Sequence, residues 1–181
     1  TSRIETLIQE LLDYAGGQRL DRKPTSVLPL LQRVGERIKP LITTHDIDLQ
    51  LDTDPALPLV ELDADQIERA LLNLCINAIQ ALNGTGQLIL KTGQTLIPVP
   101  ALEICVIDSG PGIPLAHQPY IFDPFYSTKD NGTGLGLSVV HRIITDHGGN
   151  IRIESAPVKG TIFIIHLPLT TQFCSDMLRV G

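Results

Sequence analysis

ADQIERALLNLCINAIQALNG, residues 64–84, is the most clearly patterned segment of the chain. Its apolar residues recur at every third or fourth position, which predicts an amphipathic helix over about 64–82, ended by the Asn-Gly pair. The apolar face comprises Ile67, Leu71, Leu74, Ala78 and Leu82. Asn73 and Asn77 are four residues apart, so their amides project from the same side of this helix. The segment therefore predicts a core helix that carries two neighbouring amides.

The two asparagines have two interpretations. Asparagine is a poor helix former, and amides flanked by Leu, Cys and Ile are costly to bury without partners. The amides either cap a neighbouring strand or contact water, or they present neutral oxygens to a hard cation such as Mg²⁺, which prefers oxygen ligands. The helix alone leaves both interpretations open.

Upstream of this helix, the pattern predicts a second helix and two strands. Apolar residues repeat at helical spacing from 27 to about 45, with Thr25 or Ser26 as the cap. Residues 47–51 alternate apolar and polar, and the extended pattern resumes at 59–62 after a turn bracketed by prolines. We interpret these two segments as a β-hairpin.

The N-terminal residues carry a further helical pattern. Five apolar residues within 1–14 lie at helical spacing, and a Gly-Gly pair ends the pattern. So strong an apolar stripe on a short helix needs a partner, so we expect residues 1–17 to be the end of a longer helical element. Residues 18–24 then form a polar linker.

Downstream, strands flank one long irregular segment. Strand patterns occupy 87–95, 101–107, 150–155 and 160–167, a helical pattern occupies 135–147, and residues from Thr170 carry little pattern. Residues 109–134 are rich in Gly, Pro and Asp, and loops of that length in compact domains are usually functional. Helices interleaved with hairpins favour an α/β sandwich, in which helices cover one face of a mixed, mainly antiparallel sheet.

Composition narrows the class of partner. The net charge of −6 would repel nucleic-acid phosphates and anionic lipid, and no basic patch offsets it, so we expect neither partner. Three cysteines without C-x-x-C spacing indicate neither a disulfide framework nor a zinc site, which favours a reducing, cytoplasmic compartment. No membrane span or signal peptide is visible, although the parent protein could still be membrane-anchored.

The segment from Asp108 to Ile113, DSGPGI, follows an apolar strand directly. A carboxylate at a strand end can accept a hydrogen bond from a flat ligand, for instance from an exocyclic amine, while two glycines let the backbone approach it. The alternative is an ordinary Asp-Gly turn, which is common.

A second glycine-rich segment, GTGLGLS at 132–138, leads directly into the predicted helix 135–147. Its backbone N–H groups and the helix N-terminus would suit a phosphate. Just upstream, Lys129 offers a cation that could reach a terminal phosphate, although an exposed lysine is usually only solvated. Phe122 and Phe125 lie in the same loop, and we expect them to pin it onto the body of the domain or onto a partner.

Taken together, the segments NLCINA (73–78), DSGPG (108–112), FDPFYSTK (122–129) and GTGLGLS (132–138) resemble, in order and spacing, the four signature boxes of the sensor histidine kinase catalytic domain. The closing GTIF at 160–163 also resembles that family's last strand. Within the family, the chain looks most similar to the nitrogen-regulation type of sensor kinase.

This resemblance implies a Bergerat-type ATP-binding fold over residues 25–169, and it assigns roles to individual residues. Asn77 would ligate Mg²⁺ with Asn73 beside it, and Asp108 would receive the adenine amine in a pocket that Thr161 helps to form. Residues 109–134 would be the lid over ATP. The implied nucleotide-binding set is Asn77, Asp108, Gly110, Gly112, Ile113, Lys129, Gly132, Thr133, Gly134, Leu135, Gly136, Leu137 and Thr161, with Asn73 and Lys129 as catalytic residues.

Two positions distinguish this chain from relatives. Many relatives carry a positive charge three residues after the second asparagine, where this chain has Gln80, so Lys129 is expected to carry more of the phosphate contact. The related ATPases of the gyrase, mismatch-repair and chaperone type carry a water-activating Glu where this chain has Asn73. A neutral amide cannot act as that base, so we expect slow hydrolysis and transfer of the γ-phosphate to a histidine.

The resemblance also implies partners. Residues 1–17 would be the remnant of a dimerisation and phosphoacceptor hairpin, residues 18–24 a linker, and residues 170–181 a tail. None of the five histidines fits the acceptor pattern, so the fragment is expected to be monomeric and unable to phosphorylate itself, while its parent would be a homodimer that serves a response regulator. The alternatives are a GHKL-type ATPase clamp, an anti-sigma-type serine kinase and a non-catalytic binding module.

Overall fold

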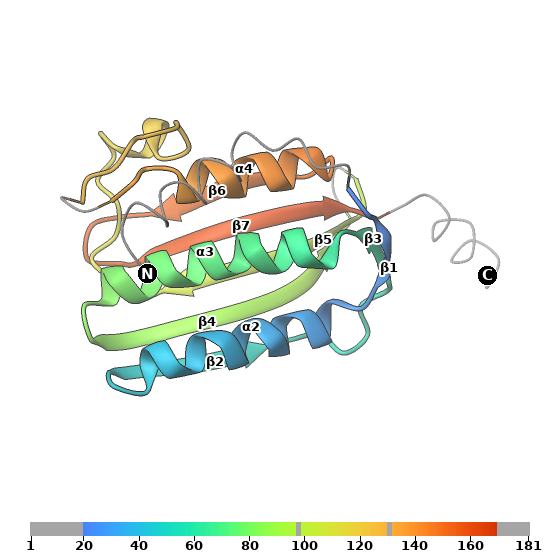
Figure 1. Ribbon diagram of the computed structural model, residues 1–181, viewed down its shortest axis with the longest axis horizontal. Helices are drawn as coiled ribbons and strands as arrows, with labels where there is room; N and C mark the ends of the chain where they lie inside the picture. Colours follow the sequence, from blue (N-terminus) through green and yellow to red (C-terminus); the bar gives the residue numbers. More distant parts are fainter. Residues whose placement is uncertain (1–19, 97–98, 130–131, 170–181) are drawn as a thin grey trace.

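The computed structural model describes residues 20–96, 99–129 and 132–169. The predicted N-terminal helix over 1–14 and the tail from residue 170 lie outside these residues. In chain order the elements are β1 (Lys23–Thr25), α2 (Val27–Ile42), β2 (Asp46–Asp52), β3 (Val60–Leu62), α3 (Ala64–Leu82), β4 (Thr85–Thr95), β5 (Ala101–Asp108), the 3₁₀ helix η1 (Gln118–Tyr120), α4 (Gly136–Asp146), β6 (Asn150–Ser155) and β7 (Thr161–Pro168) (Figure 1).

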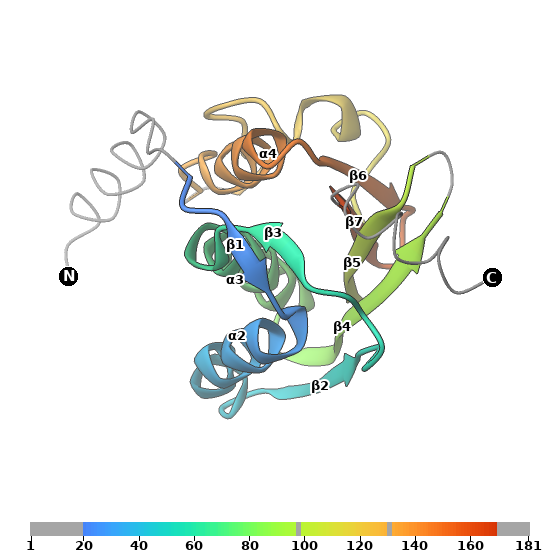
Figure 2. The same cartoon turned by 90° about the vertical axis from the view of Figure 1, so that its right-hand side faces the viewer.

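The main sheet has five strands in the order β2-β4-β5-β7-β6. Only the edge strand β2 runs parallel to its neighbour β4, and the other three pairs are antiparallel. Helices α2, α3 and α4 lie side by side on one face of this sheet (Figure 2). The predicted α/β sandwich, with a mixed and mainly antiparallel sheet and helices on one face, is confirmed.

The predicted hairpin between residues 47–51 and 59–62 is wrong. Both segments are strands, but β2 pairs with β4, while β3 pairs with β1 in a separate two-stranded sheet. Val60 and Leu62 are buried in the core among residues of α2 and α3. Alternation of apolar and polar residues shows which side of a strand is buried, but it does not specify the partner strand.

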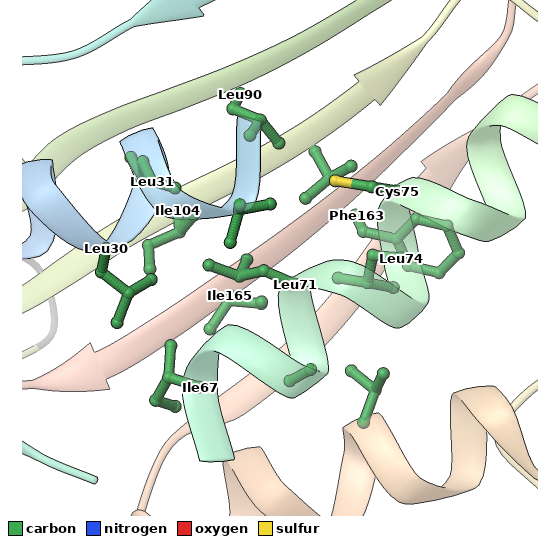
Figure 3. Close-up of a cluster of buried hydrophobic side chains, with 14 of the residues drawn as sticks. Leu30, Leu31, Ile67, Leu71, Leu74, Cys75, Leu90, Ile104, Phe163 and Ile165 are labelled. Atoms are coloured by element: carbon green, nitrogen blue, oxygen red, sulfur yellow. The ribbon is translucent and has the colours of Figure 1, made fainter. Parts of the chain in front are cut away.

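The core fills the space between the helices and the sheet. Side chains from α2, α3, β4, β5 and β7 interlock there (Figure 3), including Leu30, Leu31, Ile67, Leu71, Leu74, Cys75, Leu90, Ile104, Phe163 and Ile165. At the edge of this layer the buried carboxylate of Glu68 on α3 accepts from Arg33 at 2.8 Å and faces Arg37 at 3.1 Å, both on α2. These ion pairs hold two neighbouring helices at a fixed position along each other.

Most predicted element bounds agree with the structure to within two residues. The helix expected over about 64–82 is α3, and its N-cap Asp63 accepts a hydrogen bond from the Gln66 N–H. The helix expected up to about residue 45 ends at Ile42, and β1 includes Lys23 and Pro24 from the segment expected to be linker. Within residues 20–96, 99–129 and 132–169, no helix has the length and apolar content that a membrane crossing requires.

Candidate functional site

The C-terminal half of α3 presents three amide side chains toward Lys129 and the start of α4. Asn73 and Asn77 are half-buried, and Gln80, one turn further on, is exposed. The Asn73 side-chain amide faces the Gly136 carbonyl at the start of α4, 3.5 Å away. This contact brings the predicted asparagine pair next to the N-terminus of α4, at the end of the molecule where the long loop lies (Figure 1).

Lys129 reaches across from the loop to α3. Its ammonium donates to Gln80 Oε1 at 2.6 Å and to Asn77 Oδ1 at 3.3 Å. Much of the side chain is open to solvent, but its partial burial against the protein lowers the pKa of the ammonium from 10.5. The structure therefore places the predicted phosphate-binding lysine directly on the predicted magnesium ligand.

Asp108 ends β5, and its side chain is only 5% exposed. Burial raises the pKa of this carboxyl, while hydrogen bonds from the backbone N–H groups of Gly110 and Thr161 oppose that rise. The Gly110 N–H donates to Asp108 Oδ1 at 2.8 Å. Thr161 is buried directly across the antiparallel pair from Asp108, so two predicted residues far apart in sequence meet here.

Two glycines allow the chain after Asp108 to pass close to other backbone. A Cβ on Gly110 would lie 2.8 Å from Asp108 Oδ1 and 3.5 Å from the Ala81 side chain on α3. Gly112 has a positive φ of 77°, and a Cβ there would lie 2.2 Å from the Ala156 carbonyl oxygen. Because Gly110 adjoins Ala81, the carboxylate site and the amide site share the C-terminal half of α3.

Ser155 and Gln118 are two residues of this region that the sequence analysis did not identify. Ser155 Oγ accepts from the Ile113 N–H at 2.8 Å, donates to the Gly160 carbonyl, and lies 3.1 Å from the Thr161 hydroxyl. Gln118 donates from its amide to the Ile113 and Ser155 carbonyls. Both residues fix the loop to the ends of β6 and β7. The one feature of the sequence that could have pointed to Ser155 is its place as the polar residue at the end of an alternating strand.

The glycine-rich segment enters α4 without a side-chain cap. Leu135 is the N-cap residue and its side chain makes no capping hydrogen bond, and within the described part of the chain no partner is seen for the first N–H groups of the helix, at Gly136 and Leu137. The Leu135 side chain is buried and Leu137 packs against the core, so their contribution to a site is limited to backbone. Gly134 has a positive φ of 71° and its carbonyl accepts from the Phe125 N–H.

Gly132 and Thr133 lie just before this helix start. The Gly132 N–H donates to the Lys129 carbonyl at 3.1 Å. Thr133 Oγ1 accepts from the Leu135 N–H at 3.3 Å. The hydroxyl of Thr133 therefore helps to shape the backbone directly before α4.

The two phenylalanines of the loop differ. Phe122 packs against His141 and Phe163, with ring centroids 5.4 Å and 6.5 Å away, so it pins the loop onto α4 and β7. Phe125 is 67% exposed and has a positive φ of 65°. Phe122 therefore packs the loop onto the body of the domain as expected, whereas Phe125 does not.

This arrangement offers three kinds of chemistry at one end of the sheet. A buried carboxylate can accept from an amine, an uncapped helix N-terminus and a lysine can bind phosphate, and amide oxygens can bind a hard cation. Among the described residues, no group of three or more His, Cys, Asp and Glu side chains gathers to hold a metal. A Cβ on Gly136 would still be 4.0 Å from the Asn77 amide nitrogen, so glycine leaves space beside that side chain.

Known proteins with similar sequences indicate what this set of a carboxylate, a lysine, a helix N-terminus and amide oxygens does. The model of the histidine kinase-, DNA gyrase B- and HSP90-like ATPase family matches residues 62–171. The chain belongs to this family. Within this ATPase family its relatives are sensor histidine kinases: it is 37% identical to the sensory histidine kinase/phosphatase NtrB of Rhodobacter capsulatus, over 93% of this chain and 50% of NtrB. That match confirms the predicted similarity to the nitrogen-regulation type.

Solved structures of histidine kinases have the same fold. Full-length ShkA in complex with AMPPNP superposes with a TM-score of 0.83 at 25% identity, over 92% of this chain and 36% of ShkA. ThkA in complex with the response regulator TrrA gives 0.78 at 31% identity, over 94% of this chain and 48% of ThkA. The chain thus carries the ATP-binding catalytic domain of a sensor histidine kinase, and it spans about half or less of the length of these proteins.

Proposed function

We propose that this domain binds Mg-ATP and donates the γ-phosphate to a histidine on a helical dimerisation hairpin of its parent protein. The observation that carries the proposal is the meeting of Asn77, Lys129 and the start of α4 next to a buried Asp108. Sensor histidine kinases are among the relatives of this chain, and ShkA has been solved in complex with the ATP analogue AMPPNP.

Each part of the site has a role in this proposal. Asp108 accepts from the adenine amine, and its burial lets a single hydrogen bond discriminate among bases, because a base without that donor would leave the carboxylate unpaired. Gly110, Gly112, Ile113 and Thr161 shape the wall of the base pocket. The backbone from Gly132 to Leu137 and the ammonium of Lys129 hold the phosphates.

The donor set fits magnesium. Asn77 would hold the ion, with Asn73 beside it, through neutral oxygens of the hard type that magnesium prefers, while phosphate oxygens and water complete the shell. When bound, magnesium neutralises charge on the phosphates during transfer. Asn73 and Lys129 would orient the phosphate group.

Asn73 sets the reaction class. An amide cannot take a proton from water, so Asn73 leaves this domain without a general base at the position where related ATPases carry a glutamate. Transfer of the γ-phosphate to water is therefore slow, and the acceptor is the imidazole of a histidine. Catalysis then consists of positioning the reactants and neutralising charge.

The remainder of the parent protein supplies the partners. Residues 1–17 would be the end of the phosphoacceptor hairpin, residues 18–24 the linker and 170–181 a tail, and the hairpin would make the parent a homodimer. ThkA has been solved in complex with the response regulator TrrA, which supports a response regulator as the partner to which the phosphate here would pass. The free thiols of Cys75 and Cys105 suit a cytoplasmic site of action.

The test is to mix the chain with Mg-[γ-³²P]ATP and a separately produced histidine hairpin. We expect label on the hairpin, none on the chain itself, and loss of the label in acid, as for phosphohistidine. An acid-stable product would indicate a serine kinase, and rapid ATP turnover without any acceptor would indicate an ATPase clamp. Failure to bind Mg-ATP in calorimetry would contradict all three.

A further inference from the structure

Gln80 gives Lys129 a resting position on the proposed magnesium ligand. Gln80 and Asn77 lie three residues apart on α3, so their side chains share one side of the helix, and both amide oxygens accept from the same ammonium. The 2.6 Å contact to Gln80 is much shorter than the 3.3 Å contact to Asn77. Gln80 is therefore the main anchor of the lysine.

This position conflicts with metal binding. An oxygen that accepts from an ammonium directs a lone pair at it, and a divalent cation on the same oxygen would lie beside that positive charge. Two positive charges that share one oxygen lie so close together that little solvent fits between them, and they repel each other. The amide oxygen has two lone pairs, but the repulsion between the ammonium and a metal ion disfavours binding of both at the Asn77 oxygen.

We infer that Lys129 competes with magnesium for the Asn77 oxygen, and that Gln80 holds the lysine in the competing position. The inference rests on the proposed function, because it concerns the same metal ligand. Binding of the metal-nucleotide complex displaces the lysine, and the displaced ammonium becomes available to the terminal phosphate. Gln80 is thus a positioning residue that weakens magnesium binding and gives the Lys129 ammonium a hydrogen-bond acceptor at rest.

The test is calorimetric titration of the folded chain and its Gln80→Met variant with ADP, once with excess MgCl₂ and once with EDTA. ADP is chosen because it has no γ-phosphate, so any contact of Lys129 with that phosphate does not enter the measurement. Methionine keeps the length and helix propensity of glutamine but accepts no comparable hydrogen bond. Gln32→Met on the exposed side of α2 is the matched control.

With magnesium, Gln80→Met should bind ADP about threefold to tenfold more tightly than the wild type, the value of one net hydrogen bond. In EDTA the two proteins should agree within about twofold, and the Gln32→Met control should match the wild type throughout. No gain with magnesium, or an equal gain in EDTA, would overturn the inference while leaving nucleotide binding intact. Absence of Mg-ADP binding by the wild type would instead contradict the proposed function, and this inference with it.

A second readout follows the lysine itself. Acetylation of Lys129 by an amine-reactive ester, measured by mass spectrometry relative to the exposed Lys39, should be faster in Gln80→Met than in the wild type. Saturating Mg-ADP should raise the wild-type rate, because the metal displaces the ammonium from Asn77. A rate that is unchanged by both the variant and Mg-ADP would contradict the resting position.

Discussion

At the N-terminal end of α3, Asp63 accepts from the backbone N–H groups of Gln66 and Asp21, while its own N–H donates to His147 Nε2. In the C-terminal half of the same helix, the Asn77 and Gln80 oxygens share one lysine ammonium from a loop. The first set binds groups that folding itself fixes in place. The second set binds a long side chain that a ligand can replace.

The difference shows how one helix serves both stability and function. Changes at the N-terminal end should alter the free energy of unfolding and leave ligand affinity alone, whereas changes in the C-terminal half should do the reverse. Each of the following measurements tests whether effects on stability and effects on ligand affinity are separate in this way.

The largest effect is expected for Asn77→Ala. Loss of the oxygen that faces the cation should weaken Mg-ATP binding about 100-fold, the value of a hydrogen-bond-like contact to a charged group. Because Asn77 is only half-buried, the free energy of unfolding without nucleotide should change by less than about 1 kcal/mol. Calorimetry and urea unfolding measure the two quantities, and a large loss of stability with unchanged affinity would reverse the assignment of this half of the helix.

Glu68→Ala tests the other role of α3. Removing the buried carboxylate that Arg33 and Arg37 face should lower the free energy of unfolding by about 2 kcal/mol. The value lies below that for a fully buried pair because both arginines are more than half exposed and water screens them. Urea unfolding should show this loss, and the exposed Glu36→Ala should not. A change in Mg-ATP affinity of more than about threefold would show that the two halves of α3 are coupled.

How much of this could be predicted from sequence differs between the two roles. Periodicity and the Asn-Gly stop predict α3, and the glycine pattern with Asp108 indicates a nucleotide site through the family resemblance, because helix periods and turn residues are local properties. The pairing of β2 with β4 and the hold of Gln80 on Lys129 depend on segments 39 and 49 residues away. Contacts between distant segments leave no mark in the local pattern, so a glutamine on an exposed helix face gave no sign of its partner.

A smaller effect is expected from His147, which is buried next to Asp63. Burial lowers its pKa below the ordinary 6.5, with the charge of Arg22 acting in the same direction, while the Ile143 carbonyl, Asp63 and Asp146 oppose the shift. Because the unfolded chain then takes up the proton first, the stability from neutral His147 is present above pH 6.5 and is lost as pH falls through the lowered folded-state pKa. One proton limits the slope to about 1.4 kcal/mol per pH unit.

Urea unfolding between pH 7.5 and 5 measures this slope. His147→Gln should flatten it, because an amide oxygen can still accept from the Asp63 N–H but does not titrate. The exposed His45→Gln should leave the slope as it is in the wild type. Equal slopes for wild type and His147→Gln would mean that folding does not lower the pKa of His147.

The smallest effect is expected for Arg22→Met. Arg22 donates to the Asp146 carbonyl at 2.5 Å, but it is exposed, so its loss should lower the free energy of unfolding by less than about 1 kcal/mol at pH 7.5. The substitution also removes a positive charge that lowers the His147 pKa, so the folded state should take up its proton more readily. The stability of Arg22→Met should therefore approach that of the wild type as pH falls. Lys23→Met is the control, and a variant curve that stays parallel to the wild-type curve would show that the Arg22 charge does not reach His147.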